Sequence, residues 1–298
     1  MTPKRACVCT YVASLDSAVS DSELRNFAAY LSALSLAGCE VVVVDPEGGP
    51  RGEERQRVLR WVSRYVTGER DLIQAAIELT SSEKIIVASQ DSRYTAADVA
   101  ALCDLLDGDD VVEPEEFVDP LPWWGGIDAG SMLLQRGLDS GRDGRTFAFR
   151  RSAWHRLFAL KGASVRTAGD VFVRREPSTL AAWLRRRFTP AATPAAVTTG
   201  AAFLACVLPL VMAIAALGGY ELAGGYAGLM AAASVLVAAR GRAGAGRFFP
   251  PRACLFAPLS MLERSLAVYW ALFARLRAAE PHEPGTEPET AARGRMRV

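Results

Sequence analysis

A long uncharged stretch near residue 200 constrains the fold of this chain more than any other feature. From Phe188 to Tyr220 the sequence contains no Asp, Glu, Lys or Arg, and its most apolar part runs from residue 195 to residue 217. A helix needs about 20 apolar residues to cross the hydrocarbon core of a bilayer, so this part is long enough to span one. Pro209 is compatible with a span, because neighbouring helices can satisfy the carbonyl that it frees. We therefore predict a membrane helix at 195–217.

A second uncharged run predicts that the membrane region is a helical hairpin. After a short polar break, residues 222–239 carry no charge and are rich in Ala and Gly. Small residues of this kind let helices pack closely inside a bilayer. The predicted transmembrane hairpin occupies 188–239, with spans at about 195–217 and 222–239. The alternative is a buried helical hairpin of a soluble protein.

Charged residues beside these runs predict the orientation in the membrane. The connecting loop carries only Glu221, whereas arginines flank both runs, at positions 185, 186, 187, 240, 242, 247 and 252. Positively charged flanks stay in the cytoplasm, so we expect both ends of the chain to lie there. The N-terminal sequence lacks an apolar core of about 7–15 residues, which a signal peptide would need. The predicted location is the cytoplasmic membrane, with a multi-pass topology.

The region after the hairpin predicts a further membrane contact and a disordered tail. Within 240–277, apolar residues recur at helical spacing from Leu255 to Leu276, with charged residues between them. This pattern is typical of an amphipathic helix that lies in the membrane interface, with a third span as the alternative. Residues 278–298 contain Glu-Pro pairs and no apolar period, so we expect them to be disordered.

Residues 1–187 have the composition of a soluble domain that is large enough to bury a core. They contain 24 basic and 27 acidic residues, and the whole chain has a net charge of +1, which argues against a nucleic-acid partner. The six cysteines show no zinc-binding spacing, so we interpret them as apolar core residues.

Apolar patterning in this domain predicts an α/β fold. Buried strands are expected at 6–12, 39–45 and 84–89, and helices at 24–36, 71–79 and 96–106. Strands that alternate with helices indicate a mostly parallel sheet with helices on both faces. Two of these strands end at or near a carboxylate, Asp45 and Asp91. Ligands of parallel sheets bind beyond the carboxyl ends of the strands, so both side chains are candidate site residues.

The order of several short segments resembles a known family. After the strand ends at Asp45 and Asp91, these are Phe117–Trp124, Thr146–Ser152, Val173-Arg-Arg-Glu-Pro177 and Pro258-Leu-Ser-Met-Leu-Glu-Arg264. Together they are similar to bacterial membrane-associated family 2 glycosyltransferases. This resemblance implies a GT-A-like domain over 1–187 that binds a nucleotide-diphosphosugar, uses a divalent metal and inverts the anomeric carbon.

The resemblance also implies roles for individual residues. Asp45 corresponds to the acid that contacts the donor base, and Asp91 to the last acid of the metal-binding cluster, with Mg or Mn as the cofactor. Arg93 and Arg186 are candidates to bind the donor diphosphate, whose growing negative charge has to be offset. The cluster here reads Ser89-Gln90-Asp91 and retains a single acid, which is a poor ligand set for such an ion. For Arg186, a basic juxtamembrane anchor is the alternative.

The catalytic base is not identified by the sequence. The stretch where relatives carry an acid, Trp154–Gly169, contains neither Asp nor Glu. The candidates are Asp143, Asp170 and His155, the only histidine of the domain. For His155, a role on the surface or at a helix end is the alternative.

Two adjacent tryptophans are candidates for the sugar and acceptor end of the site. Prolines 120 and 122 stiffen the approach to Trp123 and Trp124, and Gly125-Gly126 leaves the chain free after them, which favours an exposed loop. Asp119 and Asp128 lie on either side. The alternative is that both indoles pack against the sheet.

These features predict an inverting glycosyltransferase that moves a sugar from a nucleotide-diphosphosugar to a lipid or lipid-linked acceptor at the cytoplasmic face of the membrane. The alternative is a catalytically degenerate relative that serves as a membrane-bound binding or partner subunit. The lost acids favour this alternative, whereas the retained Asp45, Asp91 and tryptophan pair favour the enzyme.

Overall fold

The computed structural model describes residues 9–16, 19–61, 64–68, 72–138, 146–154, 165–188, 210–217, 219–263 and 266. The chain divides into two compact units. The first unit contains residues 1–183 and 228–260, and the second contains residues 184–227 and 261–298. All of the described strands, and therefore the candidate site at their ends, belong to the first unit.

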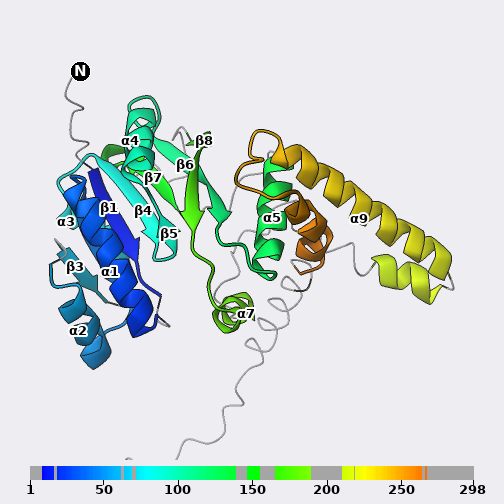
Figure 1. Cartoon of the computed structure of the whole chain (residues 1–298), viewed down its shortest axis with the longest axis horizontal. Helices are drawn as coiled ribbons and strands as arrows, with labels where there is room; N and C mark the ends of the chain where they lie inside the picture. The colour runs from blue at the N-terminus through cyan, green and yellow to red at the C-terminus, as the bar shows by residue number, and fades with distance from the viewer. Residues whose placement is uncertain are drawn as a thin grey trace, which may run out of the picture. The chain divides into compact units, whose positions relative to one another are not determined.

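The described part of the first unit contains one eight-stranded sheet, with strand order β3-β2-β1-β4-β7-β6-β8-β5. The strands are β1 (Cys9–Ser14), β2 (Glu40–Asp45), β3 (Arg64–Thr67), β4 (Lys84–Ser89), β5 (Ser92–Arg93), β6 (Val111–Val118), β7 (Phe147–Arg150) and β8 (Val165–Arg175). Strands β3, β2, β1 and β4 run parallel, as do β6 and β8, whereas β7 is antiparallel to both of its neighbours and β5 is antiparallel to β8. The prediction of a mostly parallel α/β sheet is therefore confirmed (Figure 1).

Capping and apolar spacing explain where the helices begin. The helices are α1 (Asp21–Leu36), α2 (Gly49–Val58), α3 (Leu72–Leu79), α4 (Ala96–Leu105), α5 (Gly125–Gly137), α7 (Leu180–Phe188) and α9 (Tyr220–Arg242), with short 3₁₀ turns η1 (Arg151–Ala153) and η3 (Pro251–Phe256). Ser20 and Thr95 each form a capping box with an acid three residues later, so α1 and α4 begin where their side chains satisfy free backbone N–H groups.

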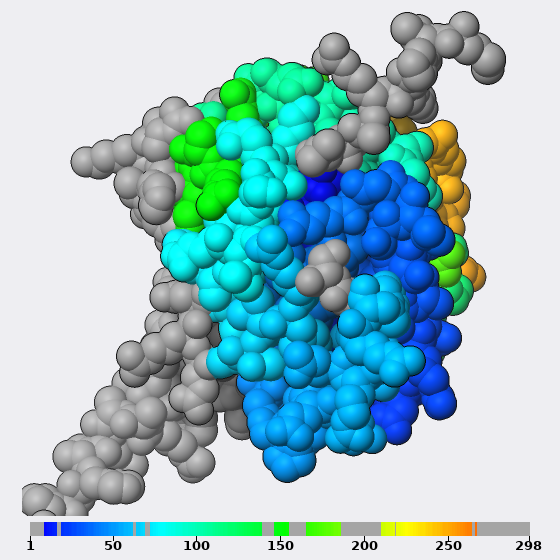
Figure 2. Space-filling model, turned by 90° about the vertical axis from the view of Figure 1, so that its left-hand side faces the viewer, coloured from blue at the N-terminus to red at the C-terminus, as the bar shows by residue number. Residues whose placement is uncertain are grey.

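Alternate residues of the central strands build two apolar cores. Tyr11 and Val43 face a core that contains Phe27 of α1 and Leu102 of α4, whereas Val12 and its neighbours face a second core with α3. This alternation follows from the two-residue period of a strand. The view onto the β3 edge shows mainly the blue to cyan part of the chain, which includes α1, α2 and α3 (Figure 2).

A third apolar cluster joins α5 to the C-terminal half of α9 and to η3. A Cβ atom on Gly126 would lie 2.8 Å from the ring of Phe256, and one on Gly137 would lie 2.2 Å from the Val237 carbonyl oxygen. Gly125 and Gly126 are buried in the first turn of α5. The expectation that these two glycines leave the chain free is therefore wrong, because Gly126 allows a close approach of α5 and η3, and a Cβ atom on Gly125 would lie 2.9 Å from the Pro122 ring.

One described helix is long and apolar enough to cross a membrane. This helix is α9, with a mean hydropathy of 1.7, and it contains the predicted span 222–239. Of the other predicted span, 195–217, only residues 210–217 are described. The hairpin therefore stays a prediction. In the expected interfacial region, η3 is followed by helical residues 257–263, and most of the remainder up to 277, like the tail 278–298, lies outside the described residues.

Candidate functional site

The ends of β1 and β4 form the topological switch point of the sheet. Strands β2 and β3 lie on one side of β1, and β4 lies on the other, so the chain reverses its direction of winding between β1 and β4. The two loops that follow these strands touch, because the Asp16 backbone N–H donates a hydrogen bond of 2.9 Å to Gln90 Oε1. A ligand crevice is expected at such a point, outside the carboxyl ends of the strands.

Asp91 lies in this region, immediately after β4. Its side chain is 9% exposed, and its Oδ1 atom accepts a short hydrogen bond from Ser89 Oγ. Its Oδ2 atom lies 3.3 Å from Nε of Arg175, at the end of β8. The two carboxylate oxygens of Asp91 thus face a hydroxyl and a guanidinium, both from the same edge of the sheet.

Arg175 is the centre of a buried ionic cluster that contains Asp91, Glu116 and Asp128. Its Nη1 atom donates a hydrogen bond of 3.3 Å to Glu116 Oε2 on β6, and its Nη2 atom lies 3.7 Å from Asp128 Oδ2 on α5. Burial lowers the pKa of the guanidinium, but the nearby carboxylates of Asp91, Glu116 and Asp128 outweigh burial and raise it overall. The cluster therefore holds a permanent cation among three acids that come from three separate segments.

The tryptophan pair lies beside this cluster, at the start of α5. Trp124 precedes Asp128 by four residues, so the two side chains share a face of the helix. The Trp124 indole N–H donates to the Ser178 carbonyl at 3.2 Å, just beyond β8. Trp183 of α7 donates to Asp128 Oδ2 at 3.1 Å. Trp123 is 64% exposed and meets Trp124 edge to face, with ring centroids 5.7 Å apart.

Two further arginines lie next to the cluster. The pairing of β5 with β8 places Arg93 opposite Arg174 and Ser92 opposite Arg175. The Arg93 guanidinium forms an ion pair of 2.5 Å with Glu176 and stacks 4.8 Å from the Tyr30 ring centroid. Arg174 lies 3.7 Å from the half-exposed Asp119 carboxylate. Arg93 and Asp119 are thus both at the predicted edge, and each already contacts an opposite charge.

Asp45 ends β2 as predicted, but its carboxylate is fully buried. It accepts hydrogen bonds from the Glu47 backbone N–H at 2.9 Å, from Arg55 Nη1 at 3.0 Å and from the Tyr65 hydroxyl. The side chains of Arg55 and Asp45 are 4% and 0% exposed. Burial, together with the hydrogen bond to Asp45, raises the pKa of Tyr65. In this structure Asp45 ties β2 to α2 and β3.

Of the three candidate catalytic bases, the structure describes only Asp170, which lies away from Asp91. Asp170 is exposed on β8, five residues before Arg175, which corresponds to roughly 16 Å along a strand. Asp143, His155 and the side chain of Arg186 lie outside the described residues.

The predicted metal site does not fit the donor set at Asp91. A hard divalent cation such as Mg needs several oxygen ligands about 2.0–2.1 Å from the ion. Asp91 instead contacts a hydroxyl and a guanidinium, and Glu116 and Asp128 contact other nitrogens of the same guanidinium. Within the described ranges, no three His, Cys, Asp or Glu side chains are arranged to hold an ion.

The sequence did not identify Arg175 and Glu116 as site residues. Arg175 belongs to the Val173–Pro177 segment that carries part of the family resemblance, and this was the one available indication of its role. The residues around Glu116 give no indication of its contact with Arg175, because Arg175 lies 59 residues further along the chain.

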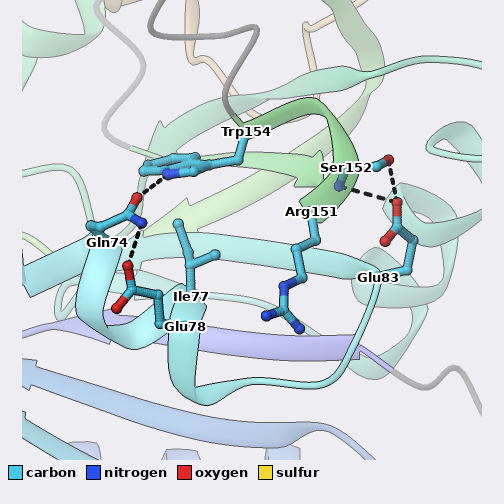
Figure 3. Close-up of a pocket in the computed structure, with 7 residues that line it drawn as sticks. All are labelled: Gln74, Ile77, Glu78, Glu83, Arg151, Ser152 and Trp154. Carbon is cyan, nitrogen blue, oxygen red and sulfur yellow. Dashed lines mark hydrogen bonds between the residues drawn. The ribbon is translucent and has the colours of Figure 1, made fainter.

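A separate cavity lies at the opposite end of β4. Its volume is about 340 Å³, and it is lined by Gln74, Ile77, Glu78, Glu83, Arg151, Ser152 and Trp154. The Trp154 indole N–H donates to Gln74, whose amide donates to Glu78 at 2.7 Å, while Ser152 donates to Glu83 (Figure 3). This cavity contains none of the residues that the sequence predicted for the site.

Comparisons with known proteins find similar structures but no related sequences. No model of a protein family matches the chain, and no curated protein matches it. A Pyrobaculum calidifontis mannosyltransferase, solved with GDP-Man and Mn2+, is 16% identical over 88% of this chain and 87% of its own, with a TM-score of 0.49. Glucosyl-3-phosphoglycerate synthase from Mycobacterium tuberculosis, solved with Mn2+ and UDP-glucose, is 13% identical over 59% and 73%, with a TM-score of 0.39. S. aureus TarS, solved with UDP-GlcNAc, is 12% identical over 58% and 59%, with a TM-score of 0.38.

Proposed function

We propose that this chain is a membrane-associated inverting glycosyltransferase. It moves a sugar from a nucleotide-diphosphosugar to a lipid or lipid-linked acceptor at the cytoplasmic face of the membrane. The nucleotide-sugar donor binds at the β1–β4 switch point, and the acceptor approaches from the side of Trp123 and α5. The GT-A type, the family 2 membership and the bacterial origin rest on the resemblance of the sequence segments.

The convergence of distant residues at one edge of the sheet carries this proposal. Asp91, Glu116, Asp128 and Arg175 come from four elements and meet at the carboxyl ends of parallel strands. Buried ionic groups are costly unless they are paired, so such a cluster at the expected ligand crevice favours a functional site over a chance arrangement. The exposed indole of Trp123 beside it offers a flat apolar face on which a sugar or an acceptor can stack.

The reaction requires two further contributions from the protein. The acceptor hydroxyl attacks the anomeric carbon as the bond to the diphosphate breaks, so a base must take the hydroxyl proton. The diphosphate gains negative charge as it leaves, and positive groups at the strand ends have to stabilise it. Arg93 and Arg174 of the paired strands β5 and β8 are placed for this second role.

The membrane part of the proposal rests on the apolar segments. Helix α9 has the length and composition of a span, and arginines flank the uncharged runs 188–220 and 222–239. An acceptor that carries a lipid would reach a domain held at this surface without leaving the bilayer. A partner subunit without catalysis is the second candidate, and the engagement of Asp45 by Arg55 and Tyr65 favours it.

Measuring whether the chain binds a nucleotide-sugar donor distinguishes the glycosyltransferase and the partner subunit from unrelated functions. The full chain, purified in detergent, is titrated calorimetrically with UDP, GDP and their sugar conjugates, and Asp91→Ala is measured in parallel. We expect one nucleotide sugar to bind saturably, and Asp91→Ala to weaken it at least tenfold without loss of the folded state. Equal affinity in the parent and in Asp91→Ala would remove the support for this donor site.

A further inference from the structure

The divalent metal that the family resemblance implies does not agree with the surroundings of Asp91. Metal-dependent binding of a diphosphate requires carboxylate oxygens that can coordinate an ion directly. Here the Asp91 carboxylate is 9% exposed, and its two oxygens are directed at Ser89 Oγ and Arg175 Nε. The Arg175 guanidinium therefore already lies beside Asp91, where a metal ion would have to bind.

Arg175 is fixed at this position from several sides. Its Nε atom faces Asp91, its Nη1 atom donates to Glu116, and its Nη2 atom faces Asp128, whose carboxylate also accepts from the Trp183 indole. The side chain of Arg175 is 9% exposed. Since a planar guanidinium carries nitrogen atoms along each edge, this one side chain approaches all three acids, with a hydrogen bond to Glu116 and ion pairs to Asp91 and Asp128.

A metal ion at Asp91 would have to compete with this guanidinium. An ion bound to Oδ2 would lie a few ångströms from a permanent positive charge in a region that water hardly reaches, where like charges repel strongly. Moving Arg175 away would leave its charge buried without its acids, which is also unfavourable. The resident arginine and a divalent cation at Asp91 are thus mutually exclusive.

We propose that Arg175 replaces the divalent cation beside Asp91, so that this protein binds its donor without a metal. The conclusion that the donor binds without a metal rests on the proposed function. The exclusion of a metal ion from Asp91 does not, because it follows from the contacts between Asp91 and Arg175. The neighbouring arginines Arg93 and Arg174, which face each other on β5 and β8, supply further positive charge at the same edge.

The first experiment measures the binding of Mn²⁺ alone to the full chain in detergent, by loss of the electron paramagnetic resonance signal of the free ion. We expect Asp91→Asn to change the affinity of the parent for Mn²⁺ by less than threefold. Arg175→Met opens the cluster and should bind Mn²⁺ at least tenfold more tightly than the parent. Adding Asp91→Asn to Arg175→Met should abolish this gain. Arg166→Met, at the other end of β8 and paired with Asp109, is the matched control and should leave Mn²⁺ binding unchanged.

Two results would overturn the inference. One is a parent protein that binds Mn²⁺ at least threefold more tightly than Asp91→Asn. The other is a folded Arg175→Met protein that binds Mn²⁺ no more tightly than the parent. If Arg175→Met does not fold, the comparison of the parent with Asp91→Asn decides alone.

The second experiment repeats the donor titration in EDTA and in Mn²⁺. Equal donor affinity in both solutions supports metal-independent binding. A donor that binds only in Mn²⁺ contradicts the inference but leaves the proposed function intact. If no donor binds in either solution, the proposed function fails, whereas the measurement with Mn²⁺ alone still decides whether Arg175 excludes the metal.

Discussion

Replacing Asp45 by Ala should destabilise the first unit far more than a surface substitution does. The carboxylate is fully buried and holds Arg55, whose side chain is 4% exposed, together with the Tyr65 hydroxyl. In Asp45→Ala the buried Arg55 guanidinium loses the carboxylate of Asp45. The family resemblance implies that Asp45 contacts the donor base, whereas these contacts predict a structural role.

The magnitude follows from the burial of the pair. Removing one partner of a buried ion pair costs about 3–5 kcal/mol, because the remaining charge is uncompensated. For a unit of this size, about 1 kcal/mol corresponds to roughly 2–4 °C in melting temperature, so we expect a decrease of about 6–20 °C. Adding Arg55→Met to Asp45→Ala removes the buried charge that has lost its partner. The double variant should therefore recover part of the lost stability.

The assay is thermal and denaturant unfolding of the full chain in detergent, with an exposed ion pair as the control. Arg51 lies 3.9 Å from Glu47 at side-chain exposures of 56% and 27%, so Arg51→Met should change stability by less than about 1 kcal/mol. The phenol of Tyr65 should also titrate at a lower pKa in Asp45→Ala, because its hydrogen bond to the carboxylate is lost. An Asp45→Ala protein within about 1 kcal/mol of the parent would refute this reasoning.

Three further predictions concern packing, pH and topology. Gly137→Ala should cost about 1–3 kcal/mol, because its Cβ would lie 2.2 Å from the Val237 carbonyl oxygen, whereas Gly228→Ala, with nothing within 4 Å, should be tolerated in the same unfolding assay. Burial raises the pKa of Tyr30 to about 12, above an unfolded value of about 10, so the contribution of Tyr30 to stability should be constant below pH 10 and fall as the pH rises toward 12. Tyr30→Phe should show a smaller loss in alkaline unfolding curves, and an equal loss would count against this origin. A reporter inserted at Gly219 should lie outside the cytoplasm and one at the C-terminus inside, and a cytoplasmic reporter at Gly219 would exclude the hairpin.

The central strands could be predicted because their sequences are continuous apolar runs. Val41–Val44 and Ile85–Ala88 are buried on both faces of the sheet, so no polar residue interrupts the apolar run that predicts each strand. Strand β6 could not be predicted in this way. It contains Pro114 and three glutamates, and its irregular pairing with β8 has a register shift after Pro114. Glu115 and Glu116 are paired with Arg136 and Arg175, which are distant in sequence, so no local pattern predicts the strand.

For the candidate site, the position of Asp91 in the fold could be predicted, but the residues around it could not. A carboxylate that follows a buried strand indicates the ligand edge of a parallel sheet, and the structure places Asp91 there. The environment of Asp91 depends on Arg175, which is 84 residues away and is brought near by the β5–β8 pairing. The role of Gly126 could not be predicted from nearby residues either. A side chain at this position is excluded by the ring of Phe256, which lies 130 residues later in the sequence.

Transfer of a sugar to lipid is the decisive measurement for the proposed activity. The full chain in detergent is incubated with radiolabelled nucleotide sugars and a total lipid extract of bacterial membranes, and label is counted in the organic phase. We expect time-dependent transfer from one donor, reduced at least tenfold in Asp91→Ala while the protein stays folded. Transfer that no donor supports above the level without protein, or that is unchanged in Asp91→Ala, would contradict it.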